Sequence, residues 1–184
     1  MKNKFTLTFI LLLSIFSFAV KSQSVLYSEP FNSNLGTCTA TNGAAGNWIW
    51  TNNCTMSTAG GHTAPGSALF QGSGCQFGNG SSTVSGDLIT PTIALSAVGN
   101  TLTFKYYLQN ECGTGGTTCS YDVLKFSISN NGGASYTDIM SSSGSPAGMT
   151  NTSGWTTITY PLTGYNSQTI RVKFNFRIVL DSHI

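Results

Sequence analysis

The chain has 184 residues, of which only 8% are charged, 40% are hydrophobic and 11% are aromatic. The aromatic content excludes a wholly disordered chain, and the length suits one domain with a hydrophobic core. The formal net charge of +2 becomes −1 when the first 22 residues are set aside, because five basic residues then face six acidic ones. This balance argues against binding to nucleic acid.

Residues 1–22 have the pattern of a secretory signal peptide. Lys2 and Lys4 precede an apolar run over residues 5–20, and small polar residues follow it. The run is short for a transmembrane helix, although an uncleaved anchor is the alternative interpretation. We therefore expect export to the extracellular space or cell surface, no membrane span after cleavage, and a single domain over residues 23–184.

Short stretches with a β pattern follow, separated by loops rich in glycine, serine and asparagine. We expect strands at residues 25–29, 48–51, 67–71, 87–90, 93–95, 101–108, 121–129, 134–139, 154–162 and 169–177. In the last of these, apolar residues point to one face, while the outward side chains are Arg171, Lys173, Asn175 and Arg177. No stretch shows helical periodicity, so the sequence predicts an all-β fold of two packed antiparallel sheets.

A hairpin is predicted where Asn-Asn-Gly-Gly, at residues 130–133, joins two alternating stretches. Leu124, Phe126 and Ile128 recur at period two before the turn and therefore share one face of a strand. The glycines supply the positive φ angles that a tight hairpin requires. This pattern indicates an antiparallel pair with one buried face.

Several short motifs occur in a fixed order along the chain. They are Ser-Glu-Pro-Phe at residues 28–31, Gly-Ser-Ala-Leu-Phe at 66–70, Asp-Leu-Ile-Thr-Pro at 87–91, Leu-Thr-Phe-Lys-Tyr-Tyr at 102–107, Asp-Val-Leu at 122–124, Ser-Ile-Ser-Asn-Asn-Gly-Gly at 127–133, Gly-Trp at 154–155 and Arg-Val-Lys-Phe at 171–174. This order resembles the MAM-like jelly-roll modules of secreted and surface bacterial proteins, especially those of gliding and sorting-system bacteria.

The resemblance implies a two-sheet antiparallel jelly-roll β-sandwich that serves for binding or spacing. Such modules accompany proteases, adhesin repeats or C-terminal sorting domains. Residues 180–184 match the closing strand of the family only loosely. One interpretation is therefore a C-terminally truncated domain, or a fragment of a larger protein.

The resemblance also implies a structural Ca²⁺ ion near the termini. Glu29 is the best candidate ligand, followed by Asp181, with Asp122 as a possible third. Ca²⁺ takes six to eight oxygen ligands, and the scattered acidic residues form no EF-hand loop. The alternative is that these are ordinary carboxylates at strand ends.

Exposed aromatic rings are candidates for stacking on sugars, with hydroxyl and amide groups available to bind sugar hydroxyls. The candidate ligand-binding residues are Tyr107, Tyr136 and Tyr165, and Tyr107 lies on the outward face of its predicted strand. The tryptophans, Trp48, Trp50 and Trp155, are expected to fill the core instead.

Export permits disulfide bonds among the five cysteines. Cys112 and Cys119 flank a glycine- and threonine-rich loop that a bridge would close. Among Cys38, Cys54 and Cys75, both Cys54–Cys75 and Cys38–Cys54 are open, and one cysteine is left over. Zinc is disfavoured because no Cys-x-x-Cys spacing occurs.

No catalytic constellation stands out, and we expect that the protein is not an enzyme. The only histidines are His62 and His183, and no Gly-x-Ser-x-Gly motif occurs. The predicted function is that of a secreted binding or adhesion module for an extracellular glycan or a surface protein. The alternative is a structural accessory or spacer domain of a larger exported hydrolase or protease.

Overall fold

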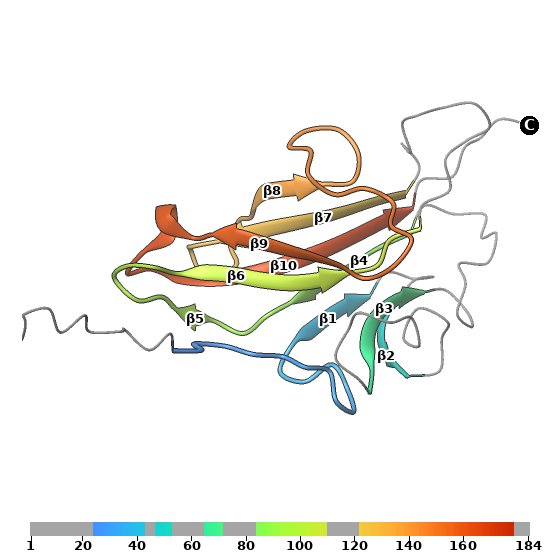
Figure 1. The fold of residues 1–184 in the computed structure, drawn as a ribbon, viewed down its shortest axis with the longest axis horizontal. Helices are drawn as coiled ribbons and strands as arrows, with labels where there is room; N and C mark the ends of the chain where they lie inside the picture. Colours follow the sequence, from blue (N-terminus) through green and yellow to red (C-terminus); the bar gives the residue numbers. More distant parts are fainter. Residues whose placement is uncertain (1–23, 43–46, 53–64, 72–83, 110–121, 179–184) are drawn as a thin grey trace, which may run out of the picture.

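A computed structural model of the protein describes residues 24–42, 47–52, 65–71, 84–109 and 122–178 (Figure 1). The described residues form strands and one turn of 3-10 helix. In chain order these are β1 (Thr39–Asn42), β2 (Asn47–Thr51), β3 (Ser67–Gln71), β4 (Val84–Ile89), β5 (Ile93–Ala94), β6 (Thr101–Tyr106), β7 (Asp122–Ser129), β8 (Thr137–Ser141), β9 (Thr156–Pro161), η1 (Thr163–Tyr165) and β10 (Thr169–Ile178).

The largest sheet has the strand order β1-β4-β10-β7-β8, and the short β5 also pairs with β10. All of these strand pairs are antiparallel. β10 is the longest strand and lies in the interior of the sheet, where β4 and β7 pair with it on either side. Its inward residues Ile170 and Val172 are each only 1% exposed, so the alternating pattern of the sequence sets which face is buried.

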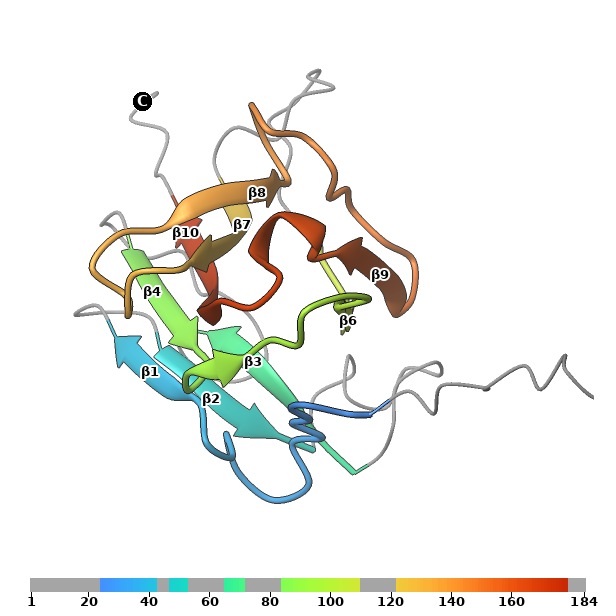
Figure 2. The same cartoon turned by 90° about the vertical axis from the view of Figure 1, so that its left-hand side faces the viewer.

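Two separate two-stranded sheets, β2–β3 and β6–β9, form the second layer. Figures 1 and 2 show β6 and β9 lying over one face of β7 and β10, with β2 and β3 beside β1 and β4. Ring contacts join the layers: the centroid of Phe104 in β6 lies 4.9 Å from that of Phe174 in β10. Phe70 in β3 lies 5.2 Å from Phe176, further along β10.

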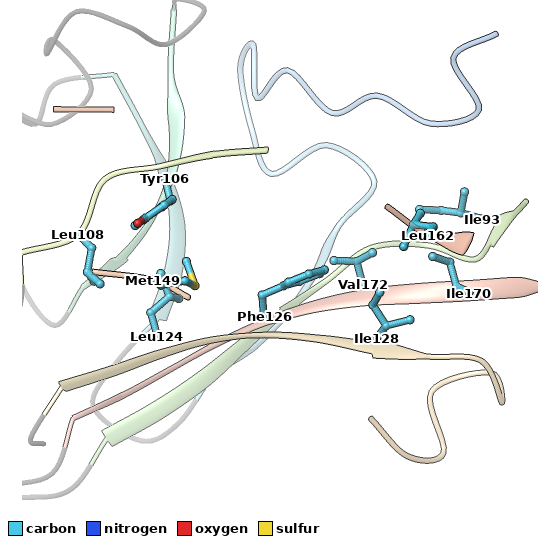
Figure 3. Packing of buried hydrophobic residues seen from close by; sticks show 10 residues of the cluster. All are labelled: Ile93, Tyr106, Leu108, Leu124, Phe126, Ile128, Met149, Leu162, Ile170 and Val172. Atoms are coloured by element: carbon cyan, nitrogen blue, oxygen red, sulfur yellow. The ribbon is translucent and has the colours of Figure 1, made fainter. Parts of the chain in front are cut away.

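The core lies between β7 and β10 on one side and β6 and β9 on the other. Its fully or nearly buried members are Ile93, Tyr106, Leu108, Leu124, Phe126, Ile128, Met149, Leu162, Ile170 and Val172 (Figure 3). Phe126 is 0% exposed, and its ring centroid is 5.2 Å from that of Phe104 and 5.8 Å from that of Tyr160. The second layer is therefore held to the first mainly by aromatic and aliphatic packing.

The predicted all-β sandwich of antiparallel sheets is confirmed, whereas the jelly-roll connectivity stays a prediction. Residues 25–29 were predicted as a strand but do not form one. Val25 is 78% exposed and Leu26 is 47% exposed, so their side chains do not pack on a sheet. Conversely, β1 was not predicted. It is a short polar segment, Thr-Ala-Thr-Asn, and pairing with β4 makes it a strand.

The connection between β7 and β8 is longer than a tight hairpin. Gly132 and Gly133 adopt the expected positive φ angles, 76° and 98°. The strands resume pairing only at Thr137, and a register shift follows next to Phe126. Asn131 Oδ1 accepts the backbone N–H of Ser135 at 3.0 Å, so an asparagine side chain holds the turn closed.

Candidate functional site

The two layers present outward faces of different chemistry. On the β6–β9 sheet, the outward residues are Thr101, Thr103, Lys105 and Tyr107 from β6 and its extension, and Trp155, Thr157 and Thr159 from the β9 side. We call this set the threonine face. Its threonines and Lys105 are exposed, and Thr103 lies directly opposite Thr159. The face therefore offers four threonine hydroxyl groups, of which one pair lies directly opposite across the two strands.

An aromatic pair forms one end of the threonine face. The ring centroids of Tyr107 and Trp155 are 6.1 Å apart, and their planes meet at 60°. The Tyr107 hydroxyl accepts a hydrogen bond of 2.8 Å from the amide of the exposed Gln109. Because the two rings are not coplanar, they meet edge to face and form an aromatic corner at this end of the sheet.

The opposite outward face belongs to the main sheet and carries most of the charge. Its basic residues are Lys125 in β7 and Arg171, Lys173 and Arg177 in β10, and its acidic residues are Asp87 in β4 and Asp138 in β8. We call this set, with Tyr136, the basic face. It holds four of the five basic residues of residues 23–184, so the net charge of the face is positive while that of the whole segment is negative.

Two ion pairs neutralise part of the basic face. Lys125 Nζ lies 2.5 Å from Asp138 Oδ2, and Lys173 Nζ lies 3.8 Å from Asp87 Oδ2. Ser127, which is 0% exposed, donates from Oγ to Asp138 Oδ1 at 2.7 Å. Burial alone would raise the pKa of Asp138, but the hydrogen bonds from Lys125 and Ser127 and the nearby lysine charges lower it overall.

Tyr136 lies between two cations of the basic face. The ammonium of Lys173 is 4.4 Å from the centroid of its ring, and the guanidinium of Arg171 lies close to its hydroxyl. A Cβ atom at Gly133 would lie 3.2 Å from this hydroxyl and 3.5 Å from Arg171 Cδ, so the turn packs closely over both side chains. Arg171 Nε is buried and has no hydrogen-bond partner. One ring face of Tyr136 is thus occupied by a cation.

The three candidate tyrosines lie in three different places. Tyr107 is on the threonine face and Tyr136 is on the basic face, as described above. Tyr165, at the end of η1, is half-buried and packs against the core, and burial raises its pKa. The three residues therefore do not form one site, and all three are half-buried.

The tryptophans also separate into different environments. Trp48 packs against the core and donates from Nε1 to Gly86 O at 3.0 Å, and Trp50 donates to Phe31 O at 2.6 Å. Trp155 is not part of the core cluster and instead contacts Tyr107. Trp50 is likewise outside the described core cluster, so the prediction that the tryptophans fill the core holds for Trp48 and not for Trp50 or Trp155.

The described part of the structure does not bring the candidate calcium ligands together. Glu29 is half-buried, and its carboxylate accepts the backbone N–H groups of Phe31 and Thr37 at 3.2 and 3.0 Å. Asp122 opens β7 opposite Ile178, and Asp181 lies outside the described residues. In the described part of the chain, no three His, Cys, Asp or Glu side chains cluster as metal ligands. Glu29 ties a loop together, and the calcium site stays a prediction.

Cys38 is a free thiol. Its Sγ lies 3.4 Å from the Tyr27 hydroxyl, and burial raises its pKa. The Cys38–Cys54 pairing is therefore not formed. Cys54, Cys75, Cys112 and Cys119, and both histidines, lie outside the described residues, so the other predicted bridges stay predictions.

Comparison of the chain with protein-family models, with curated proteins and with solved structures found no match. The resemblance to MAM-like modules consequently stays a prediction. In the ranges that the structure describes, no helix has the length and hydrophobicity needed to cross a membrane.

Sequence reasoning missed the clustering on both faces. Trp155 was assigned to the core because tryptophan is usually buried, although Tyr107 and Trp155 lie at corresponding positions just beyond the paired ends of β6 and β9. The basic face had a visible signal, namely the outward basic residues of β10. Which residues of β4, β7 and β8 lie beside them depends on the strand order, and a local sequence pattern does not reveal that order.

Proposed function

We propose that the protein is a secreted, non-catalytic binding module that holds an extracellular glycan on its threonine face. The observation that carries the proposal is the Tyr107–Trp155 pair at the end of a sheet face with four exposed threonines. Sugar rings present apolar C–H faces to aromatic rings and hydroxyl groups to polar side chains. A corner of two rings beside a row of hydroxyls offers both kinds of contact.

A rigid sheet supports such a site better than a long loop does. Phe104 and Tyr106, the inward neighbours of the face on β6, contact each other at 6.5 Å between ring centroids, and Phe104 contacts Phe126 at 5.2 Å. The backbone N–H of Leu108, next to Tyr107, is also held in place, because it donates a hydrogen bond to Thr152 Oγ1 at 3.0 Å. The backbone around Tyr107 is therefore fixed by the core below it, which lowers the entropic cost of binding.

The test is a glycan array that includes neutral and acidic glycans, probed with the exported chain. For any neutral glycan that binds, Tyr107→Ala should weaken affinity at least about tenfold, as for aromatic hot spots. Tyr107→Phe, which keeps the ring and loses only the bond to Gln109, should retain most of the affinity. Tyr136→Ala is the matched control, because it removes a tyrosine from the opposite face.

Three outcomes would contradict the proposal or a part of it. Binding to no glycan on the array would favour the alternative role as a spacer or accessory domain of a larger exported hydrolase or protease. Binding that survives Tyr107→Ala and Trp155→Ala would place the ligand elsewhere. Release of shorter products from a bound glycan during long incubation would contradict the non-catalytic part of the proposal.

A further inference from the structure

The basic residues of the main sheet form an ordered ladder along its outward face. Antiparallel pairing places the outward residues in four successive rows. The rows contain Arg171 with Ser129, Lys173 with Ser127, Asn175 with Lys125, and Arg177 with Val123. Each row therefore carries one basic side chain, and successive rows are about 7 Å apart because alternate strand residues share a face.

The ends of this ladder keep their positive charge. Lys125 and Lys173, in the two middle rows, are paired with Asp138 and Asp87. No acidic side chain of the described residues forms an ion pair with Arg171 or Arg177. These two arginines are six residues apart on β10, or about 20 Å. Arg177 is exposed, and Arg171 has a buried Nε that lacks a partner.

We propose that the basic face binds a linear acidic polysaccharide that lies along β10, with carboxylate or sulfate groups on Arg171 and Arg177. Guanidinium groups match such oxyanions with two parallel hydrogen bonds. Because Lys173 covers one face of the Tyr136 ring, that face is not available for stacking on a sugar. Tyr136 instead orients Lys173 and Arg171. Recognition on this face would therefore depend on charge.

A polysaccharide fits this face better than an acidic peptide does. A peptide commonly adds as a strand to the edge of a sheet, where backbone groups are unpaired. β10 and β7 are interior strands, and their backbone groups are already bonded to neighbours. Only side chains are left to recognise a ligand here, and an evenly charged stiff polymer can use a regular ladder of cations. The inference takes the polymer to be a glycan and in that respect rests on the proposed function.

The experiment measures binding of the exported chain to alginate and to dextran sulfate, with neutral dextran and poly-glutamate as further probes. Alginate supplies carboxylates and dextran sulfate supplies sulfates, so the two arms separate the possible anions. We expect binding to at least one of them, no binding to dextran, and weakening as salt rises, since exposed charges are screened within about 3 Å at 1 M salt. Arg177→Gln should weaken binding up to about fivefold, the range of a single exposed ion pair.

The matched control is Lys105→Gln, which removes the same charge from the opposite face. The double variant Arg171→Gln/Arg177→Gln should lose at least about tenfold, while Lys105→Gln should change little. The melting temperature of each variant shows whether it is folded, and Arg177→Gln, at an exposed site, keeps the test valid if the double variant unfolds.

Three results would overturn the inference. They are no binding to either acidic polysaccharide at low salt, equal losses for Lys105→Gln and Arg177→Gln, and binding to poly-glutamate alone. Tyr107→Ala separates the two proposals. If it abolishes neutral-glycan binding while no polyanion binds, the proposed function stands and this inference fails. If polyanion binding persists in Tyr107→Ala and is weakened in Arg177→Gln, the basic face binds independently.

Discussion

At the scale of single residues, Phe126 connects both layers of the sandwich. It is 0% exposed, and its ring contacts Phe104 and Tyr160 in the second layer and Phe174 in its own sheet. We expect Phe126→Ala to lower the free energy of unfolding by about 3–5 kcal/mol, because the change removes buried surface and leaves a cavity. Urea denaturation measures this loss. Thr103→Ala, at an exposed position, is the control, and a loss below about 1 kcal/mol at Phe126 would contradict the packing described.

Asp138 has a pH-dependent role in stability. Its pKa in the folded state lies below the usual 3.8, so the folded state favours the ionised form. The contribution is therefore complete above the usual pKa and is lost as the pH falls through the folded value. Asp138→Asn should be less stable than the native chain near pH 7, by less than about 1 kcal/mol because the pair is partly exposed. Urea denaturation from pH 7 down to pH 2.5 should show this gap closing, and a gap that stays constant would show that the charge is not responsible.

At the scale of elements, Gly86 lies where the β2–β3 sheet contacts the main sheet. A Cβ atom there would lie 2.6 Å from Phe70 Cε2 and 3.0 Å from the carbonyl oxygen of Thr41. The ring of Phe70 cannot easily move, since it packs against Trp48 and Phe176. Gly86→Ala should therefore destabilise the protein by about 1–3 kcal/mol, as overpacked sites do.

The control for this change is Gly154→Ala, because a Cβ atom at Gly154 would meet no atom within 4 Å. Thermal unfolding of the two variants compares them directly. Equal melting temperatures would mean that the β2–β3 sheet has room to shift at this contact.

The elements also show how far the sequence predicts this fold. The long strands were predictable because alternation along one strand is a local property, as in β10. β1 was not predictable, since its four residues, three of them polar, become a strand only by pairing with the edge of β4. The candidate sites were harder still. Lys125 and Arg177 are 52 positions apart in the chain, and only the strand order puts them on one ladder.

At the scale of the whole molecule, the sandwich separates two kinds of surface. The threonine face offers hydroxyls and an aromatic corner, while the basic face holds most of the cations of the segment. The shared core lies between them, so a variant on one face leaves the other in place. The two binding proposals can therefore be tested separately, each with variants on its own face.

The pairing scheme predicts unequal local stability across the molecule. β10 and β7 are each paired on both sides, whereas the β2–β3 and β6–β9 sheets join the main sheet through side-chain packing and, for β2, the hydrogen bond from Trp48 to Gly86 O. Opening one of these small sheets breaks fewer hydrogen bonds than separating β10 from β7. Native-state hydrogen exchange should therefore be slowest for amides of β10 and β7 and faster, through local opening, in the small sheets.

The variants sharpen this prediction. Gly86→Ala should speed exchange most in β2, β3 and the neighbouring β1, because the added Cβ meets Phe70 of β3 and the carbonyl oxygen of Thr41 in β1. Phe126→Ala should speed exchange in β6, β9 and the main sheet together, because Phe126 packs in the core that they share. If every strand exchanged at one rate in the native chain, and each variant changed all rates equally, the sandwich would open only as one cooperative unit. The second layer would then be as firmly held as the interior of the main sheet, and side-chain contacts would stabilise it as strongly as backbone pairing stabilises β10 and β7.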